Sequence, residues 1–162
     1  MCGARFRGFA VIYIFTIMSS SIPPQTVEAR LRERFPSHLF PEVVSLYLFG
    51  SEAKGAAHRD SDVDIGVLTD RDLAPSRDER SDLRVRLGSE LIAVTGRNEV
   101  DVAVLNDVPP GLARAIVTGG VRVYCRDEEA DRSFVRDTLL RAADLDPFLR
   151  RMREIKLRAL LT

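Results

Sequence analysis

The sequence predicts an α/β (α+β) domain in which a small mixed sheet is flanked by helices. The first observation is a set of short runs rich in β-branched and aromatic residues, which are typical of buried strands. The second is that longer segments with apolar residues at helical spacing separate these runs. The 162 residues are 45% hydrophobic, which is enough for one compact core. The strand-like runs are residues 43–49, 63–68, 98–105 and 121–125.

The N-terminal third predicts a helix followed by a strand. Val27, Leu31 and Phe35 are four residues apart, which gives one apolar face to a helix over residues 25–35. Prolines follow this segment and end the helix. The next run, residues 43–49, is almost continuously apolar and therefore predicts a buried strand.

The middle of the chain predicts two helices on either side of a strand. A short helix is expected from Ser51 to about Ala57, and a strand follows over residues 63–68. A longer helix is expected from about Ser76 to Thr95. It ends at Gly96, because glycine readily adopts the left-handed conformation that closes a helix.

The last third predicts one more strand and three more helices. Pro109 and Pro110 open a helix that continues to about Thr118, since proline is well tolerated in a first helical turn. After the strand over residues 121–125, two helices are expected. They cover residues 131–142 and 146–161, with Pro147 in the first turn of the second helix.

The chain divides into three parts by composition. Residues 1–18 are basic and then apolar, like the start of a secretory signal, but the apolar stretch is too short to span a bilayer. We expect a mis-assigned start, with Met18 as the working initiator; a signal or membrane-proximal segment and an extra buried strand are the alternatives. Residues 19–130 form the predicted core, and residues 131–162 form C-terminal helices that pack on the core or on a partner.

Charge and cysteine content exclude some classes of protein. The 24 basic residues balance the 24 acidic ones, whereas a general polyanion binder usually carries a basic excess. This balance makes RNA a less favoured partner. Cys2 and Cys125 are too few and too far apart for a zinc site or a disulfide framework.

Two small residues and three carboxylates are the candidates for chemistry. Gly50 and Ser51 directly follow the strand over residues 43–49, and Asp62 comes after ten further residues. Asp62 and Asp64 share one face of an extended segment, because residues i and i+2 of a strand point the same way. Asp101 lies in another apolar strand. Carboxylates at this density repel one another unless a cation lies between them, and hard oxygen ligands favour Mg²⁺, in one or two ions.

A turn with several solvated aspartates is the alternative interpretation of this acidic segment. The residues that follow, 65–68, are apolar and need burial, which disfavours a simple exposed turn.

Together, the Gly-Ser pair, the Asp-x-Asp motif and the later strand aspartate resemble the nucleotidyltransferase superfamily that includes DNA polymerase β. The small size is similar to its minimal nucleotidyltransferase branch, and the similarity covers residues 27–125. The resemblance implies a polymerase β-like fold for the core. It also implies nucleotidyl transfer from ATP with Mg²⁺ as the cofactor.

The resemblance assigns roles to particular residues. Asp62, Asp64 and Asp101 would be the catalytic and metal-binding residues. Gly50 and Ser51 would cradle the β and γ phosphates of ATP. A basic residue is common in the family near the position of Lys54, which would touch the triphosphate; an exposed loop charge is the alternative for Lys54.

The resemblance also implies a biological role. Small proteins of this branch act as antitoxins that transfer AMP from ATP to a tyrosine of a HEPN-type RNase toxin, so we expect a separate toxin partner and a hetero-oligomer. An ATP-dependent enzyme of this kind is expected in the cytoplasm and not in a membrane. Transfer to a small molecule or RNA, and inhibition by binding alone, are the alternatives.

The last predicted helix has an apolar stripe and a basic remainder. The sequence leaves two interpretations open, a core stripe under a solvated face and a docking surface for an acidic partner or an RNA backbone. The stripe consists of Phe148, Met152, Ile155 and Ala159, and the basic residues are Arg150, Arg151, Arg153, Lys156 and Arg158.

Overall fold

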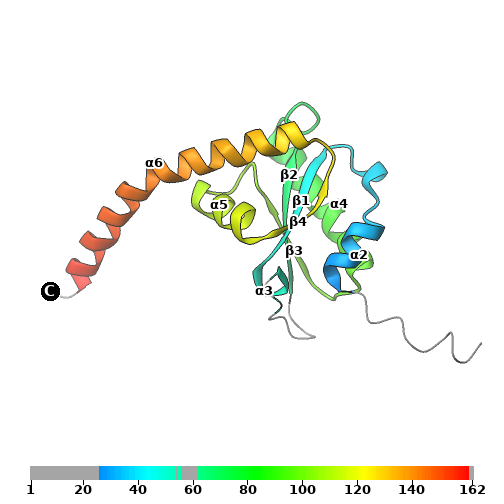
Figure 1. Ribbon diagram of the computed structural model, residues 1–162, viewed down its shortest axis with the longest axis horizontal. Coiled ribbons are helices and arrows are strands. Elements are labelled where there is room, and N and C mark those ends of the chain that lie inside the picture. Colours follow the sequence, from blue (N-terminus) through cyan, green and yellow to red (C-terminus); the bar gives the residue numbers. More distant parts are fainter. Residues whose placement is uncertain (1–25, 54, 56–61, 161–162) are drawn as a thin grey trace, which may run out of the picture.

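The computed structural model describes residues 26–53, 55 and 62–160, and it shows a four-stranded sheet with helices on both faces (Figure 1). The predicted N-terminal segment 1–18 and Lys54 lie outside the described residues. The strands are β1 (Val43–Phe49), β2 (Val63–Thr69), β3 (Val100–Val104) and β4 (Val121–Cys125). The helices are α2 (Val27–Arg34), the 3-10 helix η1 (Ser37–Leu39), α3 (Gly50–Ala53), α4 (Arg77–Thr95), α5 (Pro110–Gly119) and α6 (Glu128–Leu160).

The sheet is mixed, as predicted, and its strand order is β3-β2-β1-β4. The central strand β1 is antiparallel to both β2 and β4, whereas β2 and β3 are parallel. All four strands lie within two residues of the predicted bounds. Because β2 and β3 are parallel, the chain must cross from the end of β2 back to the start of β3. The long helix α4 forms this crossover connection.

Helices cover the sheet in two separate layers with a core on each side (Figure 1). The larger core lies between one face of the sheet and the helices α2 and α4, where Leu31, Leu83 and Leu87 are fully buried. The smaller core lies on the other face under α5 and the start of α6, and it includes Tyr47 and Ile116. Helices cover β1 on both faces, so side chains on both faces of this strand are buried. This burial explains why its sequence is almost continuously apolar.

Capping residues determine both ends of α4, a helix whose side chains line the candidate site. Ser76 caps the N-terminus: its hydroxyl accepts from the Glu79 N–H at 3.2 Å, and Glu79 accepts from the Ser76 N–H at 2.8 Å. Gly96 closes the other end in the left-handed conformation, with φ 66°. The prediction of a helix from about Ser76 to Thr95 is therefore confirmed.

The prediction of two C-terminal helices is wrong, because α6 is a single helix of 33 residues with Pro147 inside it. A proline in the sequence does not by itself show whether it opens a new helix or lies inside a longer one. It is common in a first turn, where its missing N–H has no helical partner, and it is tolerated inside a helix only at the loss of one hydrogen bond. No glycine lies between β4 and Pro147, so the left-handed residue that commonly ends a helix is missing there. An ion pair of 2.8 Å between Arg114 and Asp146 also holds the helix on α5 just before the proline. Figure 1 shows that α6 curves along its length.

The C-terminal part of α6 extends away from the core (Figure 1). Ala142 is its last buried residue among those whose side chains are described, and every such side chain from Pro147 to Arg158 is exposed. Phe148 and Ile155 are 60% and 53% exposed, so the apolar stripe does not pack on this chain's own core. Within the described residues, no helix has both the length and the apolar composition needed to cross a membrane.

A buried carboxylate attaches the first turns of α6 to the sheet. Asp131 is 2% exposed, and its Oδ1 accepts hydrogen bonds from Ser45 Oγ at 2.6 Å and from Tyr47 OH at 2.7 Å. Its Oδ2 accepts from the Arg122 guanidinium at 2.6 Å. Burial, and then the bond to Asp131, raises the pKa of Tyr47 well above its usual value. This network joins β1, β4 and α6 at one point.

Candidate active site

Two of the predicted catalytic carboxylates lie side by side on neighbouring strands. In the parallel pairing of β2 and β3, Asp64 is directly opposite Asp101. Asp64 is half-buried, and Asp101 is exposed. The alternation of the strand explains this placement, because Val63 and Ile65 on either side of Asp64 are fully buried in the core. The strand register thus brings together two acids that are 37 residues apart in sequence.

Asp62 lies one residue before β2 and is exposed. It precedes Asp64 by two residues on an extended segment, and its charge contributes to the raised pKa of the Asp64 carboxyl. Asp62 is therefore close enough to Asp64 for the two charges to interact. The residues directly before Asp62, 56–61, lie outside the described residues.

The Gly-Ser turn lies against the same carboxylates. Phe49 pairs with Asp64 across β1 and β2, so the chain leaves β1 at Gly50 directly beside Asp64. Gly50 has φ 72°, and a Cβ at this position would overlap Asp64 Oδ2 and lie 3.0 Å from Asp64 Cγ. The sequence suggested only that Gly50 leaves room for a phosphate. The structure adds that glycine is needed here to make room for the Asp64 carboxylate.

Ser51 lies in the first turn of α3, which is shorter than predicted and ends at Ala53. Glu52 of α3 forms a hydrogen-bonded ion pair with Arg97, which precedes β3 in the chain. This contact ties the Gly-Ser turn to the strand that carries Asp101. Sequence reasoning missed the pair, because 45 residues separate its members and neither belongs to a recognisable motif.

The electrostatics of the carboxylates favour a cation between them. Burial raises the pKa of Asp64, and the charges of Asp101 and Asp62 raise it further. The folded state therefore binds the Asp64 proton more tightly than the unfolded chain does. It follows that stability falls as the pH rises through the window between the unfolded and folded pKa values. A bound cation would remove this cost.

The donor set fits Mg²⁺ delivered together with a triphosphate. In nucleotide sites Mg²⁺ usually binds one or two protein carboxylates and completes its octahedron with substrate phosphate oxygens and water. Asp64 and Asp101 can supply such carboxylates. In the part of the chain that the structure describes, no three histidine, cysteine or acidic side chains are grouped to hold a metal by themselves. These residues therefore fit a site in which protein carboxylates and nucleotide phosphates both coordinate the metal, better than a site in which the protein supplies every ligand.

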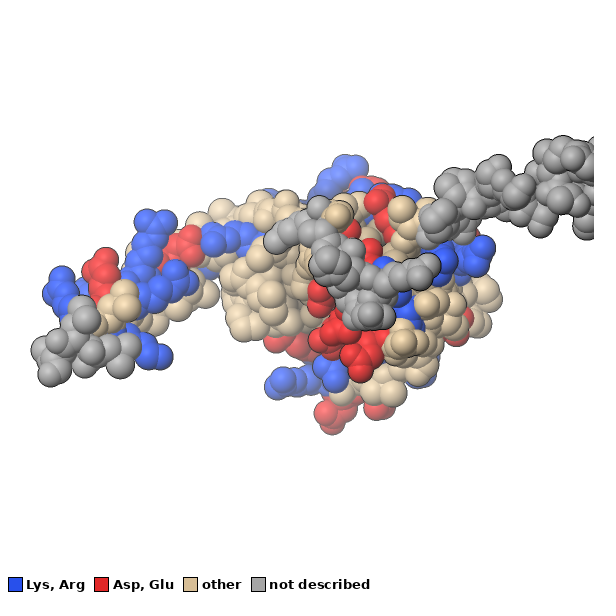
Figure 2. Space-filling view, turned by 90° about the horizontal axis from the view of Figure 1, so that it is seen from below, with Lys and Arg blue, Asp and Glu red and all other residues tan. Residues whose placement is uncertain are grey.

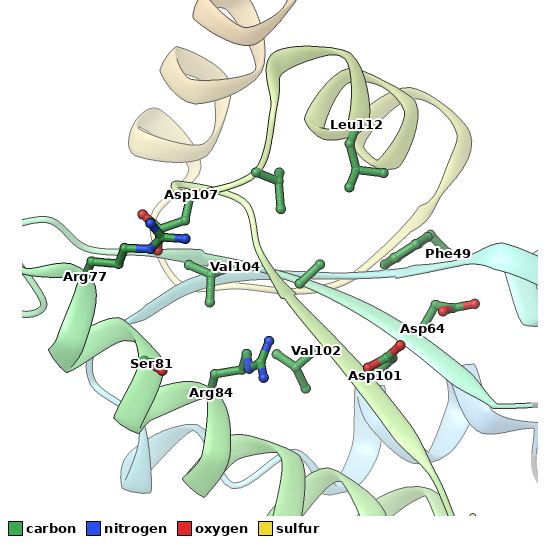
Figure 3. Close-up of a pocket in the computed structure, with 12 residues that line it drawn as sticks. Phe49, Asp64, Arg77, Ser81, Arg84, Asp101, Val102, Val104, Asp107 and Leu112 are labelled. Atoms are coloured by element: carbon green, nitrogen blue, oxygen red, sulfur yellow. The ribbon is translucent and has the colours of Figure 1, made fainter.

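A groove with a volume of about 510 Å³ begins at Asp64 and Asp101 and runs along the edge strand β3 (Figure 3). Side chains of α4 form one wall, and residues of the β3–α5 connection and α5 form the other. Figure 3 shows Arg84 reaching from α4 toward Val102, near the acidic end, and Arg77 near Asp107 at the opposite end. The groove therefore has room for a substrate beside the two carboxylates.

Replacing Gly50 with Ala is expected to lower the nucleotidyl transfer that the sequence resemblance implies by about 100-fold, since displacing a reacting group by roughly 1 Å has an effect of this size. The left-handed backbone adds a strain of about 1–2 kcal/mol for any residue with a Cβ. Gly55→Ala is the matched control, because Gly55 has φ 66° but nothing within 4 Å of its added Cβ. Pyrophosphate release and thermal melting of both variants test this prediction. Equal activity in the two variants would contradict it.

Comparisons with known proteins identify several relatives of this chain. The protein adenylyltransferase MntA of Shewanella oneidensis is 32% identical over 101 residues, which is 61% of this chain and 66% of that relative. The chain thus spans slightly less than two thirds of its length. A solved toxin–antitoxin structure with AMP-PNP is 24% identical and has a TM-score of 0.59, covering 83% of this chain and 98% of that one.

A second solved structure contains a tri-AMPylated Shewanella oneidensis HEPN toxin with an MNT antitoxin. It is 19% identical to this chain, has a TM-score of 0.55, and covers 83% of this chain and 99% of that one. These structures establish the shared fold. The model of the family described as polymerase beta, nucleotidyltransferase matches residues 31–129, which include the Gly-Ser turn and all three aspartates. Together with the paired Asp64 and Asp101, this match places the chain in the polymerase β-like nucleotidyltransferase family.

Proposed function

We propose that this protein is an antitoxin that transfers AMP from ATP to a tyrosine of a HEPN-type RNase toxin encoded nearby. The observation that carries the proposal is the Gly-Ser turn packed against Asp64, which itself is paired with Asp101. The 32% identity to a protein adenylyltransferase supports a protein acceptor. The likeness to the AMPylated toxin complex supports a HEPN partner and a hetero-oligomer.

Most residues of the site would bind the metal and the nucleotide, and Asp101 would also act on the acceptor. Asp62, Asp64 and Asp101 would hold Mg²⁺, which when bound neutralises charge on the triphosphate. The α3 turn with Gly50 and Ser51 would position the β and γ phosphates through backbone N–H groups and the hydroxyl. Asp101, on the edge strand beside the groove, would accept the proton of the attacking hydroxyl. The α phosphorus is then attacked in line, and pyrophosphate leaves.

The exposed end of α6 supports a macromolecular partner. Apolar and basic side chains alternate around a helix that projects from the core, and Figure 2 shows Lys and Arg gathered over this end. Monomeric proteins rarely expose apolar stripes of this kind without a partner. We assign this surface, defined as the exposed apolar residues Phe148, Met152 and Ile155, to the toxin.

Ile155→Asp is expected to weaken association with the toxin about tenfold or more, because a buried charge would replace an apolar contact. The Ile155→Asp variant should fold as stably as wild type, since Ile155 is 53% exposed. Leu73→Asp is the matched control, at an apolar residue that is 50% exposed on the core. Co-purification with the tagged toxin and thermal melting measure the two effects. Equal retention of the toxin by both variants would contradict the assignment.

Intact-mass measurement of the co-expressed toxin tests the proposed function. Each transferred AMP adds about 329 Da with loss of pyrophosphate, and peptide mapping should place it on tyrosine. Label from ATP found on RNA or on a small molecule would instead support those acceptors. An unmodified but fully inhibited toxin would show that inhibition works by contact alone.

A further inference from the structure

Arg84 places an unpaired positive charge in the groove beside β3. Its side chain is exposed on α4, and Figure 3 shows it reaching toward Val102, the neighbour of Asp101 in β3. Within the part of the chain that the structure describes, Arg84 forms no hydrogen bond or ion pair. Arg77 lies two helical turns earlier, about 10 Å along α4, and lines the same groove. The α4 wall of the groove is therefore basic.

Asp107, the acid at the far end of the groove, already has a partner. It accepts two hydrogen bonds from Arg80, at 2.9 Å to Oδ2 and 2.7 Å to Oδ1. This contact, and to a smaller extent the nearby charge of Arg77, holds the pKa of Asp107 below its usual range. Part of the charge of Arg77 thus acts on Asp107, which leaves Arg84 as the principal cation that this wall offers to a ligand.

The proposed catalytic carboxylates do not neutralise Arg84 either. A guanidinium bound to Asp64 would lower the pKa of that carboxyl, because it would favour the charged form. Instead, burial and the charges of Asp101 and Asp62 all raise the pKa of Asp64. Arg84 thus lies near the acidic end of the groove without being paired to Asp64. Its guanidinium is available to an anion that enters beside β3.

In-line transfer places the acceptor on the side of the site where Arg84 lies. The leaving pyrophosphate and the attacking hydroxyl lie on opposite sides of the α phosphorus. The Gly-Ser turn, which would hold the β and γ phosphates, follows β1. Across the sheet, Phe49 at the end of β1 pairs with Asp64, and Asp64 pairs with Asp101. The acceptor hydroxyl therefore enters from the β3 side, where the groove lies and α4 carries its arginines (Figure 3).

We propose that Arg84, supported by Arg77, binds an acidic side chain of the toxin close to the tyrosine that accepts AMP. This inference rests on the proposed function and names what the protein recognises around its acceptor. A tyrosine hydroxyl carries no charge at neutral pH, so the anion must come from a neighbouring residue. In a protein that anion is a carboxylate, which pairs with a guanidinium through two parallel charge-assisted hydrogen bonds. The tyrosine hydroxyl would then lie at Asp101.

An RNA end would also offer an anion and a hydroxyl, but two observations favour a protein acceptor. The chain has equal numbers of basic and acidic residues, so it lacks the overall basic excess of a general RNA binder. The exposed apolar residues of α6 also fit a protein surface better than a phosphate backbone.

Steady-state kinetics of AMP transfer to the purified toxin test the inference in wild type, Arg84→Gln and Arg86→Gln. Arg84→Gln is expected to raise the KM for the toxin about tenfold, the usual effect of losing a charge-assisted hydrogen bond. Its kcat at saturating toxin and its KM for ATP should stay within about twofold of wild type. The reason is that a contact away from the reacting atoms stabilises the bound acceptor and the transition state equally.

Arg86→Gln is the matched control. Arg86 lies on the same helix and loses the same charge, but it is paired with Glu42 at 2.8 Å and does not line the groove. This variant should therefore match wild type in all three constants. An equal KM for the toxin in the two variants would overturn the inference. A raised KM for ATP in Arg84→Gln would also overturn it, and would assign Arg84 to the incoming nucleotide.

A double-substitution experiment identifies the acidic partner of Arg84. Peptide mapping locates the modified tyrosine, and each acidic residue near it in the toxin is changed to its amide. For one of these changes, combination with Arg84→Gln should raise the KM no further than either change alone, because both remove the same contact. Combination with Arg86→Gln should give the full sum of the separate effects. Additive effects at every acidic residue, or a tyrosine without acidic neighbours, would contradict the inference.

The inference and the proposed function can fail separately. AMP on a toxin tyrosine, with none of the expected effects of Arg84→Gln, would overturn the inference and leave the proposed function intact. No AMP on the toxin in wild type would overturn both. Label from ATP found on RNA ends in place of the toxin would overturn both as well, and would assign the groove to RNA.

Discussion

Asp64→Asn is expected to reduce AMP transfer about 1,000-fold or more while the fold stays intact. The Asp64 carboxylate is half-buried between the Gly-Ser turn and Asp101. Loss of one metal-binding oxygen removes several kcal/mol of charge stabilisation, and about 4 kcal/mol corresponds to three powers of ten in rate. Pyrophosphate release with Mg²⁺ and ATP measures the effect.

Two further measurements separate lost chemistry from lost folding. Without Mg²⁺, Asp64→Asn should melt at the same temperature as wild type or higher, because the substitution relieves the repulsion that raises the pKa of Asp64. With Mg²⁺ and ATP, wild type should gain stability by mass action, by about 2.7 kcal/mol at 100 times the Kd, and the variant should gain less. Asp72→Asn, an exposed aspartate just beyond the other end of β2, is the matched control. Wild-type rates in Asp64→Asn would refute the assigned site.

Substitution of Asp64 together with Asp62 tests whether the proposed toxin is inhibited by AMP transfer or by binding alone. The double variant Asp62→Asn, Asp64→Asn keeps α6 and therefore should still bind the toxin. Cells that produce the toxin should nevertheless lose protection with this variant. If they remain fully protected, the toxin is inhibited by binding, and the proposed role of AMP transfer is wrong even though the family assignment stands.

Asp131→Ala is expected to destabilise the protein by about 3–5 kcal/mol, the range for removing one partner of a buried charged network. The substitution would leave the hydroxyls of Ser45 and Tyr47 and the guanidinium of Arg122 without their shared acceptor. Since whole domains have only about 5–15 kcal/mol of stability, this is a large fraction of the total. Urea denaturation at neutral pH measures it.

Asp137→Ala is the control for Asp131, because Asp137 is on the same helix, its side chain is 46% exposed, and its ion pair is a 3.3 Å contact with Arg136. Exposed pairs of this kind contribute about 0–1 kcal/mol. A change below about 1 kcal/mol in Asp131→Ala would show that the network does not anchor α6. The position of the proposed toxin-binding surface would then depend on other contacts of α6, such as the ion pair with Arg114 of α5.

Much of the fold could be predicted because local rules decide it. The apolar runs predicted all four strands, and the capping signals at Ser76 and Gly96 predicted the ends of α4. The Gly-Ser pair and the Asp-x-Asp motif could also be found in sequence, since a turn and a strand fix their spacing over short distances. These features depend on neighbours within a few residues, where sequence patterns are informative.

Only the tertiary structure decided how distant residues meet. The parallel register that places Asp64 opposite Asp101, and the groove that brings Arg84 of α4 to the same edge, depend on the order in which strands associate. The continuous path of α6 through Pro147 depends on the absence of a turn and on its contact with Arg114. The sequence by itself thus determined the chemistry available to this protein. The packing of the sheet decided where that chemistry comes together, because pairing energies between distant segments leave no periodic signal in a single chain.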